Sequence, residues 1–159
     1  MGNCLTKKIV TSPPHEGTSL TSVEVRDIIK RAFRIDNDAI IFIGDREYFA
    51  YSIDKLQEFL AEDSVNKLTY ANERLDCDDF ARILQGRERE WFSKSTSGSG
   101  ASTLGCVWGD LRPSEESTEP NYHAMNFFID SERRVFMIEP QNDEIRLITS
   151  NSTHFFVEV

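Results

Sequence analysis

The run Asp76-Cys77-Asp78-Asp79 constrains the fold most, because it predicts where a central helix begins. Asp76 is a suitable N-cap residue, and Asp79 stands three residues later in capping-box register. We therefore expect a helix with Cys77 in its first turn. Two runs of strand-forming residues, 122–129 and 134–139, follow near the C-terminus and predict an antiparallel pair. Helices followed by strands indicate an α+β domain.

The N-terminal half carries further helix signals. Thr21 and Glu24 form a capping box ahead of apolar residues at helical spacing, and residues 53–61 repeat that spacing. Residues 36–38, Asp-Asn-Asp, predict a turn, and residues 104–109 predict a strand. The N-terminal half is thus expected to supply helices, and the C-terminal half the sheet.

Composition bounds the class of protein. The chain has 159 residues, enough for one compact domain, which we place at residues 20–159 after a flexible tail at 1–19. A net charge of −9 argues against a nucleic-acid surface and favours a cationic partner or a metal ion. Three widely spaced cysteines suit a reducing compartment, and no secretory or membrane-spanning segment is visible. We expect an intracellular protein, in the cytoplasm or at the cytoplasmic face of a membrane.

The first six residues, Met-Gly-Asn-Cys-Leu-Thr, fit the N-myristoylation pattern. Gly2 would carry the acyl chain, and Cys4 is a natural second acylation site. Two chains anchor a protein stably, whereas one holds it marginally. The tail therefore predicts a membrane surface as a possible partner; the alternative is a chance Met-Gly start on a disordered tail.

Cys77, His123 and Glu139 follow the order of a Cys-His-acid triad. The start of a helix favours a thiolate at Cys77. If the turn between the two strands is residues 130–132, His123 and Glu139 lie opposite each other on one face of the sheet. The alternatives are a buried, inert cysteine on an apolar helix face, a surface histidine and a glutamate at a strand end.

The aspartates on either side of Cys77 suggest that a cation binds near the cysteine. A carboxylate about 6 Å from the sulfur opposes its ionisation by roughly 2–3 kcal/mol at an effective dielectric near 20. A divalent ion held by Asp76 and Asp78 would remove that conflict, and carboxylates select calcium or magnesium over zinc. Helix caps, or ion pairs with Arg74 or Arg82, remain the alternative.

Several motifs also carry a family resemblance. These are Asp76-Cys77-Asp78-Asp79-Phe80-Ala81, Val107-Trp108-Gly109, His123-Ala124-Met125-Asn126 and Ile138-Glu139-Pro140-Gln141-Asn142-Asp143. Together they resemble the papain-like cysteine protease domain of the mushroom agglutinin family, and the first is similar to transglutaminase-like cysteine peptidases. The resemblance implies a papain-like fold, Cys77 as nucleophile, His123 as base, Glu139 as the orienting acid, and calcium near Asp76 and Asp78. The chain shows no separate sugar-binding domain, so we do not expect lectin activity.

We therefore predict a papain-like single domain with N-terminal helices packed on a C-terminal antiparallel sheet. The predicted function is cysteine hydrolysis of a peptide or isopeptide bond in a peptide or protein substrate, with calcium and no organic cofactor. Amide transfer to an amine is an alternative within the same chemistry. A non-catalytic binding or regulatory module on the same fold is the alternative from another class. The oligomeric state stays open.

Overall fold

A computed structural model describes residues 17–110, 121–148 and 153–159, with side chains described there except at residues 34–38 and 153–155. The predicted acylation sites Gly2 and Cys4 and most of the acidic segment before His123 lie outside the described residues. The described elements run in the order β1 (Thr18–Thr21), α1 (Ser22–Ala32), β2 (Arg34–Phe42), β3 (Glu47–Ala50), α2 (Ile53–Glu62), a 3-10 turn (Val65–Lys67), α3 (Cys77–Ser95), β4 (Ala101–Ser102), β5 (Leu104–Asp110), β6 (Tyr122–Ile129), β7 (Val135–Glu139), β8 (Glu144–Leu147) and β9 (Thr153–Glu158).

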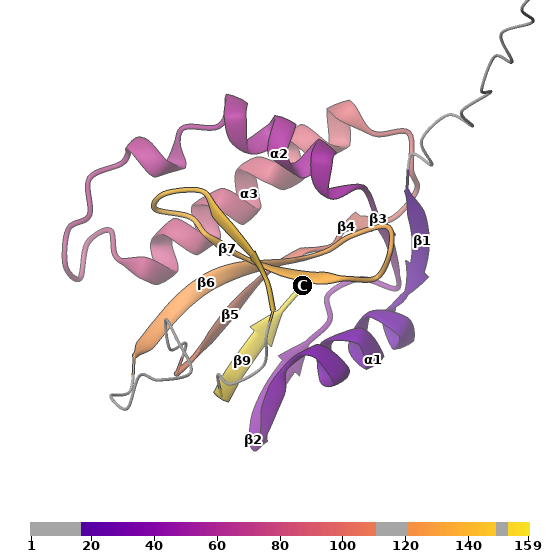
Figure 1. The fold of residues 1–159 in the computed structure, drawn as a ribbon, viewed down its shortest axis with the longest axis horizontal. Coiled ribbons are helices and arrows are strands. Elements are labelled where there is room, and N and C mark those ends of the chain that lie inside the picture. The colour runs from indigo at the N-terminus through magenta and orange to yellow at the C-terminus, as the bar shows by residue number, and fades with distance from the viewer. Residues whose placement is uncertain (1–16, 111–120, 149–152) are drawn as a thin grey trace, which may run out of the picture.

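The strands form two sheets (Figure 1). A small sheet has the order β1-β3-β4, and a larger one has the order β2-β9-β5-β6-β7-β8. β2 pairs in parallel with β9, whereas the other neighbours in the larger sheet pair antiparallel. The larger sheet therefore combines a strand from the N-terminal half with strands from the C-terminal half.

Helices cover both faces of the larger sheet, with α1 on one side and α3 and α2 on the other (Figure 1). Alternate side chains of β6 enter two separate cores because a strand points successive residues to opposite faces. Met125 and Phe127 pack in the core that includes residues of α1. Phe128 packs with Phe80 and Leu84 of α3. Burying each such large apolar side chain contributes about 1.5–3 kcal/mol, so both faces of β6 stabilise the fold.

The predicted helix starts are confirmed. Thr21 caps α1 in a reciprocal capping box with Glu24, whose backbone N–H donates to the Thr21 hydroxyl at 3.3 Å. Asp76 is the N-cap of α3, which begins at Cys77, and its backbone N–H donates to Asp79 Oδ2 at 3.2 Å. These local signals need only neighbouring residues, which explains why the sequence was sufficient to find them.

The fold class needs a correction. The domain is a mixed α/β fold with two sheets, but the expected papain-like arrangement of N-terminal helices on a C-terminal sheet is not confirmed, because the N-terminal half also supplies β1, β2 and β3. The turn predicted at residues 36–38 lies within β2, where the pairing with β9 is irregular between Ile35 and Ile40. Such an irregularity lets turn-forming residues remain within a strand.

Candidate functional site

His123 on β6 and Glu139 on β7 form a close pair. His123 Nε2 lies 2.7 Å from Glu139 Oε2, and the two side chains are 20% and 18% exposed. The Gln141 backbone N–H donates to the other oxygen, Glu139 Oε1, at 3.3 Å. The carboxylate thus fixes the imidazole and is itself held by the turn after β7.

The pair forms although the strand register differs from the predicted one. Ile129 pairs with Val135, so the connecting segment has five residues, 130–134, where three were expected. This shift by two residues keeps His123 and Glu139 on the same face, since side chains alternate with a period of two. The Asp130 carboxylate holds the longer turn by accepting from the backbone N–H groups of Glu132 and Arg134 at 3.0 and 2.8 Å.

The His123–Glu139 pair borders a small polar pocket, which we call the His123 pocket. Its volume is about 380 Å³, and its lining residues are Asn121, His123, Met125, Glu139, Gln141, Asn142 and Arg146. These residues come from the first half of β6 and the residue before it, from the end of β7 and the turn after it, and from β8. Side-chain amides, an imidazole and a guanidinium around one hollow can orient a polar ligand by hydrogen bonds.

Cys77 is the first residue of α3. α3 packs over the face of β6 that carries Asn126, whose Nδ2 donates to the Ala81 carbonyl at 2.9 Å. His123 alternates with Asn126 and shares its face with Met125, on the side of α1. Within the described part of the chain, the Cys77 thiol is half-buried and free, and no hydrogen bond joins it to His123. The structure therefore brings together His123 and Glu139, and among the described residues no hydrogen bond links Cys77 to that pair.

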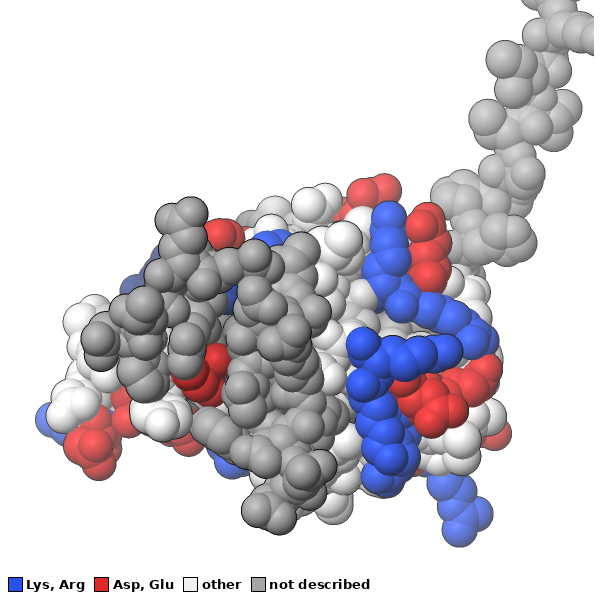
Figure 2. All heavy atoms as spheres, turned by 60° about the horizontal axis from the view of Figure 1, so that its bottom comes forward, with Lys and Arg blue, Asp and Glu red and all other residues white. Residues whose placement is uncertain are grey.

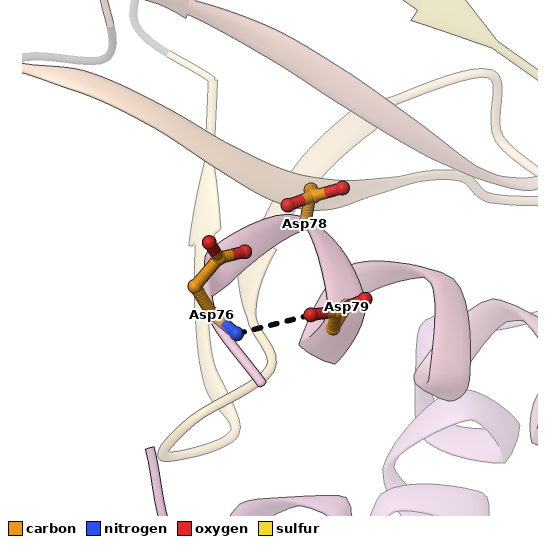
Figure 3. A group of neighbouring side chains, drawn as sticks. All are labelled: Asp76, Asp78 and Asp79. Atoms are coloured by element: carbon orange, nitrogen blue, oxygen red, sulfur yellow. Dashed lines mark hydrogen bonds between the residues drawn. The ribbon is translucent and has the colours of Figure 1, made fainter. Parts of the chain in front are cut away.

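An acidic cluster lies at the start of α3 (Figure 3). One carboxylate oxygen from each of Asp76, Asp78 and Asp79 lies within 4.8 Å of the others. Asp76 Oδ1 is buried and has no hydrogen-bond partner. A hydrogen bond with the neighbouring Asp76 carboxyl, followed by burial and the charges of Asp76 and Asp79, raises the pKa of Asp78. Like charges this close are stabilised by a shared proton or by a cation.

The nearby arginine does little to neutralise the cluster. Arg82 Nε lies 3.8 Å from Asp78 Oδ2, but the two side chains are 57% and 43% exposed, so that pair contributes little. Asp76 and Asp78 are the two ligands that the sequence predicted, and Asp79 joins them through its role in the helix cap. Three carboxylates and a buried oxygen without a partner match the oxygen ligands of calcium.

Sequence reasoning missed Arg146 and Asn142 as lining residues of the His123 pocket. Arg146 lies on β8, a four-residue strand that the sequence analysis did not predict. The alternation of charged and apolar residues in residues 144–147, Glu-Ile-Arg-Leu, was the available signal.

Comparisons with known proteins identify relatives. The model of the family "Agglutinin C-terminal" matches residues 48–145, more than half of the chain. A solved structure described as "PSL1a-E64 complex" is similar with a TM-score of 0.73 and 22% identity over 89% of this chain and 50% of that one. Polyporus squamosus lectin, bound to the human-type influenza-binding epitope Neu5Aca2-6Galb1-4GlcNAc, has a TM-score of 0.69 and 23% identity over 89% of this chain and 49% of that one. No curated protein matches by sequence.

These comparisons confirm the agglutinin resemblance and contradict the prediction of an enzyme. The matching family is an agglutinin family, and one matched structure is a lectin with a bound glycan. Neither supports the likeness to papain-like proteases or transglutaminase-like peptidases. On the strength of these relatives we withdraw the hydrolase and thiol protease assignments. This chain spans about half the length of the matched structures.

Proposed function

We propose, from the premise that this chain belongs to the agglutinin C-terminal family, that it is a non-catalytic binding module whose ligand occupies the His123 pocket. The observation that carries the proposal is the prearranged His123–Glu139 pair at the edge of a polar hollow. A fixed imidazole presents its second ring nitrogen without paying conformational entropy on binding. Such preorganisation is as useful to a binding site as to an enzyme.

The size and lining of the pocket support a small polar ligand or the end of a larger one. A volume of about 380 Å³ lies near the lower end of the range for small-molecule sites. Gln141 and Asn142 offer amide groups that both donate and accept hydrogen bonds, as hydroxyl-rich ligands require. We take a glycan as the first ligand class, because Polyporus squamosus lectin is bound to one. This choice revises the expectation from the sequence, where the lack of a separate sugar-binding domain argued against lectin activity.

We further propose that calcium binds Asp76, Asp78 and Asp79. Support comes from the converging carboxylates and from the buried Asp76 Oδ1 without a partner. When bound, the ion would neutralise the acidic start of α3 and stabilise the folded state. The three aspartates would hold it through their carboxylate oxygens. α3 packs on β6, the strand that carries His123. An ion that stabilises the first turn of α3 would therefore also stabilise the position of β6.

The test is a binding titration followed by NMR spectroscopy, with Neu5Aca2-6Galb1-4GlcNAc and a panel of short peptides as probes. We expect saturable shifts at residues of the His123 pocket with the glycan. Glu139→Gln should weaken binding, because it removes the charge that orients His123. Cys77→Ala is the matched control and should bind like the wild type.

Two outcomes would overturn the proposal. One is the absence of shifts in the pocket with every probe. The other is cleavage of a peptide that disappears in Cys77→Ala. Either outcome counts only if Glu139→Gln and Cys77→Ala are folded and melt at the same temperature as the wild type.

A further inference from the structure

β2 forms one edge of the larger sheet, because β9 is its only neighbour in the order of the described strands. The Phe42 carbonyl accepts from the Val159 backbone N–H, on the side of β9, at 3.1 Å. Successive residues of a strand direct their backbone N–H and C=O groups to opposite sides, so Ile41 directs its groups away from β9. An outer edge of this kind can pair with a further strand.

Two exposed apolar side chains lie along this edge. Ile40 is 61% exposed and Phe42 is 54% exposed. Ile41 and, on β9, Val157 pack in the core that includes residues of α1. Because side chains alternate along a strand, Ile40, Phe42 and Phe156 point to the opposite face, which α3 partly covers. We call these three residues, together with the outer backbone of β2, the β2 edge surface.

An apolar row crosses three strands to reach this surface. Ile40 pairs in register with Phe156 of β9, and Phe156 pairs with Trp108 of β5. α3 covers the inner end of the row, where Arg82 Cζ lies 5.2 Å from the centre of the Trp108 ring. A further strand beside β2 would continue the row and cover its outer end.

The register partners of this part of β2 all belong to the described residues. Residues 40–42 face residues 156–158 of β9. The chain leaves the described part after Asp110 and re-enters it at Thr153, and these two residues pair with each other at the opposite end of β9. The β2 edge surface thus lies among described neighbours.

This half of β2 lacks the usual protection of an edge strand. Residues 39–43, Ala-Ile-Ile-Phe-Ile, contain no charged residue, proline or glycine. Edge strands of natural sheets commonly carry a charge, a proline or a bulge, which prevents pairing with other chains. The irregular pairing of β2 lies earlier, between Ile35 and Ile40. A regular, apolar and open strand favours a partner in extended conformation.

Charges around the surface indicate the chemistry of that partner. Glu158 faces Phe42 in register. Residues 34–47 and Glu158 together contain five acidic and two basic residues, and Arg89 Nη1 adds a cation 3.9 Å from Asp45 Oδ2. A second copy of this chain would bring an equal acidic charge to the interface, which like-charge repulsion disfavours. A segment with Lys or Arg on either side of its apolar residues is complementary.

We propose that the β2 edge surface binds an extended segment of a partner protein, which pairs with β2 as an additional strand. Backbone hydrogen bonds to Ile41 would hold the segment, and its apolar side chains at alternate positions would cover Ile40 and Phe42. Basic residues at its ends would face the acidic surroundings. The surface shares no residue with the His123 pocket, so this proposal does not depend on the proposed function.

The experiment is an NMR titration of the full chain with a short synthetic peptide in which valine and threonine alternate between pairs of lysines. We expect saturable shifts at residues 39–43. A peptide with proline in place of its central valines cannot pair as a strand and should bind at least about 10-fold more weakly. Exchange of the lysines for glutamates should have a similar effect, because it replaces attraction by repulsion.

A pair of variants tests the surface itself. Ile40→Lys should weaken binding of the lysine peptide about 10-fold, because it removes an apolar contact and adds repulsion. Leu147→Lys is the matched control and should bind like the wild type. Leu147 is 51% exposed on β8, the other edge strand of the larger sheet, and its substitution changes the net charge equally.

Three outcomes would overturn the proposal. The first is a lysine peptide that shifts no residue of β2 in the folded chain, and the second is a proline peptide that binds β2 as tightly. The third comes from sedimentation: a wild-type dimer that Ile40→Lys makes monomeric, and that the lysine peptide does not dissociate, would assign the edge to a second copy. If Ile40→Lys does not fold, the comparison of peptides on the wild type decides.

Discussion

At the scale of single residues, the carboxylates of Asp76, Asp78 and Asp79 govern how the start of α3 responds to cations. Their mutual repulsion is relieved when calcium binds the native cluster, and the unfolded chain lacks that geometry. Binding at 100 times the dissociation constant would stabilise the fold by about 2.7 kcal/mol. The pKa of Asp78, raised by its neighbours, should fall when the ion is bound.

We predict that calcium raises the melting temperature and that Asp78→Asn reduces this rise. The variant removes one charge from the ligand set and keeps the side-chain volume. Asp54→Asn, in the exposed first turn of α2, is the matched control and should keep the full effect. Equal melting temperatures with millimolar calcium and with chelator would mean that these aspartates are only helix caps.

Glu88 is the second residue whose charge state matters. It is fully buried on α3, where the hydroxyls of Tyr51 and Ser102 donate to its Oε1 at 2.5 and 2.6 Å. Its Oε2 has no partner, and Arg89 is the nearby cation. Burial raises the pKa of Glu88 from 4.5 to about 7, so the folded state retains a proton that the unfolded state loses.

The consequence is a loss of stability as pH rises. The contribution of protonated Glu88 is complete below pH 4.5 and is lost as pH rises through about 7, a change of roughly 3 kcal/mol. Glu88→Gln has no carboxyl to ionise here, so the variant should not lose this stability as pH rises. The free energy of unfolding of the variant minus that of the wild type should therefore increase by roughly 3 kcal/mol between pH 4.5 and pH 8. Urea unfolding at both values measures it. A difference that does not change with pH would show that Glu88 is not protonated in the fold.

At the scale of elements, Asn126 ties α3 to the sheet. Its Nδ2 donates to the Ala81 carbonyl of α3 at 2.9 Å and to the Gly105 carbonyl of β5 at 3.2 Å. Asn126→Asp would put a carboxylate against two carbonyl oxygens in a fully buried position. We expect a loss of at least about 3 kcal/mol at pH 7, because a buried charge without a donor is costly.

Urea unfolding of Asn126→Asp checks this prediction. Asn72→Asp is the matched control, because Asn72 is exposed and the same change of charge should alter stability by less than about 0.5 kcal/mol. Equal stability of the two variants would mean that Asn126 does not link α3 to the sheet.

The elements also show what a sequence can predict. The starts of α1 and α3 were found because a helix cap is set by residues three positions apart. The sequence did not predict that β2 lies beside β9. A parallel pair between strands far apart in the chain leaves no local signal. His123 and Glu139 were paired correctly because strand alternation survives a register shift of two. Cys77 was assigned to them from chain order, its place at a helix start and the family resemblance, and no local pattern can measure its distance from a strand 46 residues later.

At the scale of the whole molecule, charge is unevenly distributed on an acidic protein. Figure 2 shows a band of Lys and Arg side chains on the face that carries α1, with acidic side chains beside it. Arg26, Lys30 and Arg31 of α1 and Arg133 after β6 are all exposed. No described helix is both long and apolar enough to cross a membrane.

We propose that acylation of Gly2 and Cys4 brings this chain to the cytoplasmic face of a membrane. A fusion of residues 1–20 to a soluble reporter should then partition to membranes in a eukaryotic cell, because two acyl chains anchor stably. Gly2→Ala should release the reporter by preventing the first acylation. A reporter that remains soluble with the native tail would remove the lipid proposal.

The central claim is that the protein binds a ligand without catalysing a reaction. The most direct test is to look for peptide cleavage that depends on Cys77. The wild type and Cys77→Ala are incubated with calcium and a fluorescently labelled unfolded protein, and released fragments are measured. In parallel, the intact mass of each is recorded after exposure to E64, the compound present with PSL1a. We expect no fragment release above that of Cys77→Ala and no calcium-dependent E64 adduct at Cys77. Calcium-stimulated cleavage that requires Cys77 would contradict a non-catalytic binding module.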